Sequence, residues 1–293
     1  MTTQERLAEQ FEQHRAHLRG VAYRMLGSMD EADDAVQEAW LRLARSDTTD
    51  VVNLRGWLTT VVSRVSLDLL RSRKSRAEVP LDVHVPDPVV TPLAADPASD
   101  PQAAAEQADE VTLALLVVLD ALTPRERTAF VLHDTFGVPF EQIGEIVGTS
   151  TAAATQLASR ARRRVRSAQP AVADRATQRQ VLEAFTTAAR QGDFEALVSV
   201  LDPDVTLRAD AGPGGPSIVV RGAAEVASRA VSFRRTAGDQ VLVLVNGVLG
   251  LLSVRDGRPV SVFSPVVRGG RIVEINILAD PERLARLDLH GVV

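Results

Sequence analysis

Apolar residues recur at three- and four-residue spacing through much of residues 10–166, and after that point they cluster in short runs. The first spacing places apolar side chains along one face of a helix, whereas short β-branched runs between turn residues indicate strands. The pattern therefore predicts an all-helical amino-terminal part that is followed by a smaller unit of helices and strands.

The clearest helical pattern lies at residues 123–166. Thr123 is followed by a proline and then by Glu126 in the first turn, which is a strong signature of a helix start. A second helix is predicted to end at Gly148, because glycine permits the tight turn that follows. The apolar face of this second helix consists of Phe140, Ile143, Ile146 and Val147.

A third helix is predicted to begin at Ser150 or Thr151, either of which can cap it, and to continue through Arg166. Such an arrangement is typical of a helix-turn-helix, whose last helix enters the major groove of DNA. Residues 160–166 contain five arginines and no acid, and such a cluster favours contacts with phosphates. We expect the packed side of this helix to contain Ala153, Leu157 and Ala161.

The polar side chains of the third helix are the candidates for DNA contact. Short side chains near the helix start can reach base edges, and glutamine can pair with adenine. The arginines instead contact the phosphate backbone and position the protein without specifying sequence. A solvated arginine-rich helix in a bundle is the alternative interpretation, and the density of arginines favours DNA binding over it. The candidates are Thr151, Thr155, Gln156, Ser159, Arg160, Arg162, Arg163, Arg164 and Arg166.

Two further helices are predicted between Leu18 and Leu43, with an interruption near residues 27–30. The second of them begins with a cluster of acids, which suits the positive end of the helix dipole, and Asp30 can cap it. A solvated first turn is sufficient to explain these acids without any partner. The exposed face of this helix consists of Asp33, Asp34, Gln37 and Glu38.

A basic helix is predicted to begin near Leu54 and to continue into Arg76. Residues 51–77 contain six basic groups and one acid, and they form a second basic patch, separate in sequence from the arginine cluster. Trp57 could stack on an unpaired base, but a tryptophan at the head of an apolar helix is more often part of a core. The candidate DNA contacts here are Arg55, Trp57, Arg64, Arg71, Arg73, Lys74 and Arg76.

Taken in order, these motifs resemble those of the extracytoplasmic-function sigma factors of bacterial RNA polymerase, over residues 10–166. The resemblance rests on the acidic helix that ends at Trp40, on Arg55-Gly56-Trp57-Leu58, and on Leu122-Thr123-Pro124-Arg125-Glu126-Arg127. It implies two all-α sigma domains, at residues 1–77 and 111–167, of which the second is the helix-turn-helix.

The resemblance also implies roles for these elements. The helix from Arg55 to Arg76 would melt and hold the minus-ten element of the promoter, and residues 46–53 would capture a flipped base. The helix from Thr151 to Arg166 would read the minus-thirty-five element. The residues implied to bind core RNA polymerase are Asp33, Asp34, Gln37 and Glu38.

The two predicted sigma domains are joined by residues 78–110, which contain eight acids, six prolines and no lysine or arginine. Proline and like charges keep such a chain extended, and its composition buries little apolar surface. We therefore expect a solvated linker. In the sigma family the corresponding linker passes toward the active-site and RNA-exit channels of the polymerase.

A second linker, at residues 168–177, precedes a unit at 178–293 that begins with a helix ending near Gly192. Six β-branched runs follow, with a helix at 223–233 between the second and third runs. Asn-Gly, Asp-Gly and Gly-Gly pairs separate the last four runs, and the last two of these pairs indicate hairpins. This order predicts an α+β cone and resembles the SnoaL-like branch of the NTF2-like superfamily.

Sigma factors with a carboxy-terminal SnoaL-like domain form a recognised subgroup, and two of its motifs have partial counterparts in this chain. One is the glycine-rich segment at residues 210–214, and the other is the tail segment Ala279-Asp280-Pro281-Glu282-Arg283-Leu284. The resemblance implies that this domain regulates the sigma domains in cis. The residues implied in this regulation are Asp210, Gly212, Gly214, Asp280, Pro281 and Leu284.

Cones of this type can also be enzymes or ligand sensors, with ionisable side chains in a pocket. Asp210, Arg208 and Asp239 are the candidates here, but a glycine-rich turn is a sufficient explanation for Asp210. We predict no enzymatic activity and no catalytic residue. The alternatives are a helix-turn-helix regulator that acts without polymerase, and a DNA-binding protein fused to a SnoaL-like enzyme or ligand-sensing domain.

The composition of the chain indicates the cellular compartment in which it acts and the partners that it binds. The chain has no cysteine, which excludes disulfides and cysteine-ligated zinc and suits a reducing cytoplasm. No apolar run approaches about twenty residues, so we expect neither a signal peptide nor a membrane span. The net charge of −5 argues against a chain that binds DNA alone, whereas a sigma factor binds DNA together with polymerase.

The expected partners are therefore core RNA polymerase and promoter DNA, in addition to an intramolecular contact between the carboxy-terminal domain and the sigma domains. We expect a cytoplasmic protein that is a monomer when free, with no cofactor and no metal. The expected architecture is multidomain, with two all-α helical sigma domains followed by an α+β NTF2-like cone.

Overall fold

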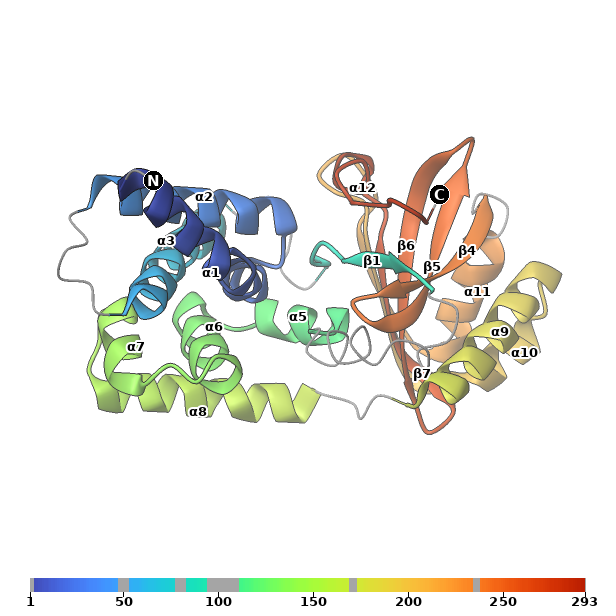
Figure 1. Cartoon of the computed structure of the whole chain (residues 1–293). Coiled ribbons are helices and arrows are strands. Elements are labelled where there is room, and N and C mark those ends of the chain that lie inside the picture. The colour runs from blue at the N-terminus through green and yellow to red at the C-terminus, as the bar shows by residue number, and fades with distance from the viewer. Residues whose placement is uncertain are drawn as a thin grey trace. The chain divides into compact units, whose positions relative to one another are not determined.

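A computed structural model of the chain describes residues 3–46, 53–76, 83–93, 111–168, 173–233 and 238–292. The chain divides into two compact units, and Figure 1 shows both, with most of their elements labelled. The first unit, Met1–Ala77 with Val118–Ala168, is helical. The second unit, Glu78–Val117 with Gln169–Val293, is built around a mixed sheet. The predicted order of helical domains followed by an α+β domain is confirmed.

The first unit begins with three packed helices, α1 (Thr3–Leu26), α2 (Met29–Arg45) and α3 (Leu54–Arg76). α1 is longer than predicted, because the polar segment before Leu18 continues the helix and buries Phe11 against Trp40. α2 begins at Met29 after Ser28, so the prediction that Asp30 caps this helix was wrong. The bounds predicted for the basic helix, α3, are confirmed.

The helix-turn-helix is also present. It consists of α6 (Pro124–Phe130), a π-helical turn at Val131–Thr135, α7 (Phe140–Val147) and α8 (Thr151–Ala168), and α5 (Leu113–Asp120) precedes it. The capping box that joins Thr123 and Glu126 is formed, and Gly148 adopts the left-handed conformation with φ 71°. Ser150 accepts a hydrogen bond from the Ala153 N–H at 3.3 Å and caps α8.

The packed side of α8 differs from the prediction by one residue. Its buried side chains are Ala154, Ala158, Ala161 and Val165, whereas Ala153 and Leu157 are only half-buried. Small side chains at three of the four positions allow α8 to pack closely against α6 and α7. The predicted polar face remains outward.

The sheet of the second unit has the strand order β1-β4-β5-β6-β7-β2-β3, and all neighbours are antiparallel except β2 and β7. Asn246 and Asp256 adopt positive φ angles of 49° and 52°, as the tight turns between β4, β5 and β6 require. The strands are β1 (Val90–Pro92), β2 (Leu201–Asp210), β3 (Ile218–Arg221), β4 (Asp239–Val245), β5 (Val248–Arg255), β6 (Arg258–Arg268) and β7 (Arg271–Leu278).

Helices cover one face of this sheet (Figure 1). Val181 and Phe185 of the first helix pack with Val205 and Leu207 of β2 in a buried cluster. The short helix α10 was not predicted, and the first helix of this group begins at Arg175. The helices that cover this face are α9 (Arg175–Gln191), α10 (Phe194–Val200) and α11 (Ala223–Phe233), and the short helix α12 (Pro281–Leu284) follows β7.

One strand of this sheet comes from the acidic linker. β1 pairs with β4 and forms the edge of the sheet, with Val90 opposite Val245, and Val83 and Val85 are buried as well. The expectation of a solvated linker is therefore wrong for residues 83–93. The valines that alternate with acids and prolines bury apolar surface on a sheet that already exists, and Pro92 is tolerated because β1 is an edge strand.

Candidate functional site

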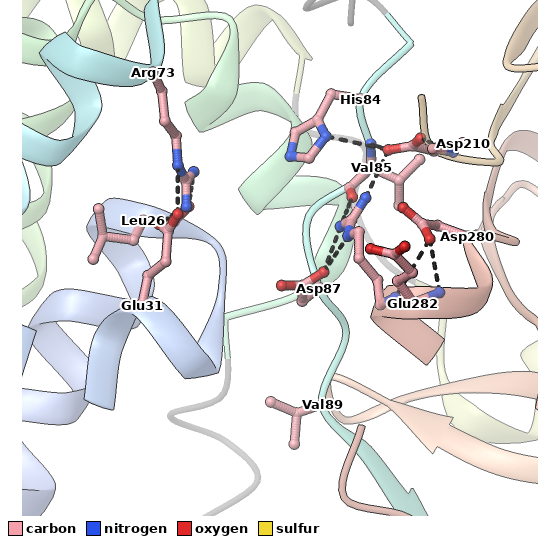
Figure 2. A network of polar contacts seen from close by, with 12 residues as sticks. Leu26, Glu31, Arg73, His84, Val85, Asp87, Val89, Asp210, Asp280 and Glu282 are labelled. Atoms are coloured by element: carbon pink, nitrogen blue, oxygen red, sulfur yellow. Dashed lines mark hydrogen bonds and ion pairs between the residues drawn. The ribbon is translucent and has the colours of Figure 1, made fainter. Parts of the chain in front are cut away.

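A network of polar contacts holds the linker on the carboxy-terminal domain (Figure 2). At its centre is Asp210, the last residue of β2, which is 1% exposed. Its carboxylate accepts hydrogen bonds from the Val85 N–H at 3.0 Å and the Gly212 N–H at 3.1 Å, and contacts His84 Nδ1 at 3.1 Å. Alternate strand residues point to opposite faces, so Asp210 lies on the face opposite to Leu207 and the helices.

Arg283 of α12 supplies the positive charge of this network. Its guanidinium donates to Asp210 at 2.8 Å and to Asp87 at 2.6 Å, and it also donates to the Val85 carbonyl. Arginine suits this position because its planar donors can reach two carboxylates and a carbonyl at once. Asp87 and Val85 belong to the linker, so Arg283 joins the linker to the body of the domain.

The protonation state of this network is fixed by its geometry. Burial raises the pKa of Asp210, but hydrogen bonds from His84, Val85 and Gly212 and the charge of Arg283 outweigh burial and hold it well below its usual range. Asp210 is therefore a charged acceptor.

The two predicted regulatory segments meet at this point. Asp280 caps α12 by accepting from the Glu282 N–H at 2.9 Å, and its side chain lies so close to Gly212 that a Cβ there would overlap it. Leu284 is buried, whereas Pro281 is exposed and Gly214 faces open space. Asp210, Gly212 and Asp280 are thus brought together, and Gly214 is not.

Asn246 forms a second attachment of the linker. It is 3% exposed, and its Oδ1 accepts from the Val89 N–H at 3.1 Å while its own N–H donates to the Val89 carbonyl at 2.8 Å. Its Nδ2 donates to the Val111 carbonyl at 3.0 Å. One buried amide therefore binds both Val89, before β1, and Val111, which follows residues 94–110. We call Asp210, Arg283 and Asn246 the linker clamp.

Sequence reasoning missed most of this clamp. His84, Val85 and Asp87 were assigned to a solvated linker, and Asn246 was interpreted only as a turn residue. Asp210 was predicted as a regulatory residue, and Arg283 stands in the predicted tail segment at residues 279–284. The three residues considered for an enzyme have separate environments: Asp210 is in the clamp, Arg208 pairs with Glu274 at 2.9 Å, and Asp239 is exposed.

The acidic face of α2 is exposed as predicted. Asp34 and Gln37 are exposed, Asp33 pairs with Arg19 at 2.7 Å, and Glu38 pairs with Arg42 at 2.8 Å. These pairs leave both carboxylates at the surface, where solvent screens them. Leu41, one turn beyond Gln37, is 38% exposed and places an apolar side chain beside the acids.

The predicted minus-ten helix, α3, contains basic residues in different environments. Arg73 donates to the Leu26 carbonyl at 2.8 Å, at the end of α1, and pairs with Glu31 of α2 (Figure 2). Arg55 contacts His17, Arg71 pairs with Asp68, Arg64 is exposed and Trp57 is half-buried. The side chains of Lys74 and Arg76, and residues 47–52 of the predicted base-capturing loop, lie outside the described residues.

Within the first unit, α3 packs against α6 and α7. Gln142 of α7 donates to Thr60 Oγ1 at 2.7 Å and to the Gly56 carbonyl at 3.2 Å. His17 packs edge-on against Phe136, and burial, followed by the charges of Arg55, His14 and Arg24, lowers its pKa to about 4. The predicted DNA-binding helix is thus partly covered by the helix-turn-helix.

The arginines of α8 separate into two groups. Arg160 and Arg164 face Glu126 at 3.5 and 3.0 Å, and Arg162 pairs with Asp134 at 2.5 Å. Arg163 and Arg166 are exposed, together with Thr151, Thr155, Gln156 and Ser159. The predicted base-reading and backbone-contacting side chains therefore share one accessible surface of the helix.

Comparison with known proteins agrees with this arrangement. Residues 10–76 match the family model for sigma-70 region 2, and residues 112–165 match that for sigma-70 region 4. The extracytoplasmic-function RNA polymerase sigma factor SigJ of Mycobacterium tuberculosis is 41% identical, over 94% of this chain and 92% of its own length. The chain belongs to the extracytoplasmic-function sigma factors.

The resemblance to sigma factors extends beyond the two sigma domains. A probable sigma factor of this family from M. tuberculosis, SigI, is 36% identical over 95% of both chains. The crystal structure of M. tuberculosis SigJ superposes with a TM-score of 0.74 at 38% identity, and covers 96% of this chain and 99% of that one. The match to SigJ and SigI thus extends through the carboxy-terminal domain, and a polymerase-independent regulator is not favoured.

The described part of the chain adds two observations. None of its helices is long and apolar enough to cross a membrane. Nowhere among the residues with assigned positions do three or more histidines and acids gather as metal ligands would.

Proposed function

We propose that this sigma factor binds core RNA polymerase through the exposed face of α2, the minus-ten element through α3 and the minus-thirty-five element through α8. The exposed acids around Asp34 and the exposed arginines Arg163 and Arg166 support these assignments. Its place of action is then the cytoplasm, where core polymerase and promoter DNA are found. The free chain is proposed to be a monomer.

We further propose that the carboxy-terminal domain restrains the linker. The observation that supports this is the linker clamp, in which Arg283, Asp210 and Asn246 bond the backbone at Val85, Val89 and Val111. A linker paired as an edge strand cannot at the same time extend into a channel of the polymerase. The clamp would therefore have to open when the sigma factor engages the polymerase, and its stability would lower the apparent affinity.

The affinity of core RNA polymerase for the full-length chain tests this proposal. Arg283→Ala removes the donor to Asp210 and Asp87, and we expect it to raise the affinity for polymerase. Arg286→Ala is the matched control, because Arg286 is exposed on the same tail. Unchanged affinity in the Arg283 variant would contradict restraint by the clamp, and lower affinity would show that the clamp supports binding.

A further inference from the structure

Glu126 is a buried carboxylate at the junction of two helices of the helix-turn-helix. It is 4% exposed, and it closes the capping box of α6 by accepting from the Thr123 N–H at 3.1 Å and hydroxyl at 2.8 Å. The same carboxylate receives Arg164 Nη1 at 3.0 Å and lies 3.5 Å from Arg160 Nε. Glu126 therefore bonds the start of α6 and the arginines of α8 simultaneously.

Capping alone does not explain this choice of residue. A glutamine can take the same place in a capping box, and it is neutral when buried. Burial raises the pKa of Glu126, but the hydrogen bonds from Thr123 and the charges of Arg164 and Arg160 outweigh burial and lower it. The carboxylate is therefore charged at neutral pH, and both of its charged partners are on α8.

Arg160 and Arg164 remain accessible while they are paired. Their side chains are 52% and 56% exposed, in contrast to 6% for Glu126. An arginine has five N–H donors, and Glu126 engages only one side of each guanidinium. Other donors of these half-exposed side chains can therefore still bind a phosphate.

We propose that Glu126 is a positioning residue for DNA binding. It fixes the orientation of Arg160 and Arg164 before these arginines contact phosphates. The inference rests on the proposed role of α8 at the promoter. Long side chains lose conformational freedom when they are immobilised at an interface, and this loss weakens binding. The pairs with Glu126 already restrict Arg160 and Arg164 in the folded chain. The arginines therefore lose less conformational freedom when DNA binds.

The test uses holoenzyme assembled from core polymerase and the full-length chain. The probe is a fluorescently labelled duplex, selected by the wild-type holoenzyme from a random pool. Glu126→Gln retains the shape and the capping bonds but releases the arginines, and we expect about fivefold weaker binding. The dependence of affinity on salt should remain, because the number of phosphate contacts is unchanged.

Thr123→Ala is the control for a merely structural role. It removes the hydroxyl of the capping box but leaves the pairs between Glu126 and the arginines, so it should lower thermal stability without weakening DNA binding. Arg164→Ala in the wild-type and Glu126→Gln backgrounds provides a second readout. If Glu126 acts through Arg164, the loss of affinity caused by Arg164→Ala is smaller in the Glu126→Gln background.

The outcomes separate the inference from its premise. Arg163→Ala should weaken DNA binding whether or not Glu126 positions its partners. If Arg163→Ala, Arg164→Ala and Glu126→Gln all leave affinity unchanged, the proposed role of α8 is wrong. If Arg163→Ala weakens binding and Glu126→Gln does not, the positioning role is wrong. Tighter binding with a steeper salt dependence in Glu126→Gln would show that Glu126 competes with the phosphates, which also overturns the inference.

Discussion

The helices α3 and α8 are both basic in sequence, yet the structure uses their arginines differently. Arg73 of α3 is partly buried, and it bonds the last carbonyl of α1 and the acid Glu31. Arg163 of α8 is exposed, and Arg160 and Arg164 are paired at the surface. A run of basic residues thus predicts that a surface is positively charged, but it does not predict which side chains a phosphate can reach.

In each helix, the exposure of the arginine depends on the acid with which it pairs. Glu31, in the first turn of α2, lies across from the end of α3, and its partner Arg73 is only 35% exposed. Glu126 is also in a first turn, but its partners stay about half exposed. Acids in first turns are stabilised by the helix dipole in any case. Such an acid also positions an arginine only where an arginine of another helix lies within pairing distance, as Arg73 does for Glu31 and Arg164 does for Glu126.

The largest effect is expected for Arg73→Ala. The substitution leaves the Leu26 carbonyl and Glu31 without this donor, and we expect the free energy of unfolding of the first unit to fall by about 1–3 kcal/mol. Denaturant unfolding of the full-length chain measures the loss. Arg71→Ala, which breaks only an exposed pair with Asp68, should change stability by less than about 0.5 kcal/mol. Equal effects of the two substitutions would contradict the internal role of Arg73.

Charge reversal on α2 extends the comparison to an acidic helix. Asp34 is exposed, so Asp34→Arg should leave the fold intact but reduce affinity for core polymerase about tenfold or more, through charge repulsion. Surface plasmon resonance with immobilised core enzyme measures this loss. Asp68→Arg on α3 is the matched control for an exposed acid outside the proposed docking face. Unchanged polymerase binding by Asp34→Arg would rule out that face.

Arg163→Ala tests the exposed side of α8. We expect one fewer phosphate contact, so the slope of log affinity against log salt should fall by about 1. The loss of affinity should be similar for promoters that differ in the minus-thirty-five element, and stability should stay within about 0.5 kcal/mol. Titration of labelled duplexes at several salt concentrations measures both quantities. A loss that is confined to one base position would indicate base readout instead.

The smallest effect is expected at His17, beneath the packed helix-turn-helix. Its pKa in the folded chain, about 4, is below the ordinary 6.5, so the unfolded chain takes up the proton first as pH falls. The stability that the neutral ring contributes is complete above pH 6.5 and is lost as pH falls toward 4. The ring is only half-buried, so the loss should not exceed about 1 kcal/mol.

Unfolding measured at several pH values checks this expectation. His17→Gln should flatten the dependence of stability on pH between 6.5 and 4. His290→Gln, at an exposed position, should leave it unchanged. If both variants retain the wild-type dependence, other groups are responsible for it.

Local signals predicted most of the fold. The capping box at Thr123, the glycine turn at Gly148 and the tight turn at Asn246 involve residues within four positions of one another, so the sequence specifies them directly. Predictions that depended on rotation of a helix were weaker. The buried face of α8 was displaced by one residue, because alanines occupy both candidate faces and apolar periodicity cannot choose between them.

The linker shows what composition could not predict. Acids and prolines correctly indicate that residues 78–110 have no core of their own. Val85 and Val90 are nevertheless buried, because the sheet supplies an edge at β4 and the face opposite to α9, α10 and α11. A polar segment can pack in this way only if the rest of the fold offers such a surface. The sequence of the segment itself does not specify that surface.

The sequence by itself determined the succession of helices and strands, the helix-turn-helix and the position of its arginines, since these follow from periodicity, caps and turn residues. Only the tertiary structure decided which charges are available. The pairs Arg73 with Glu31, Arg164 with Glu126, and Arg283 with Asp210 join residues 42, 38 and 73 positions apart. Ion pairing depends on distances of a few ångströms between separate elements, and no local pattern fixes those distances.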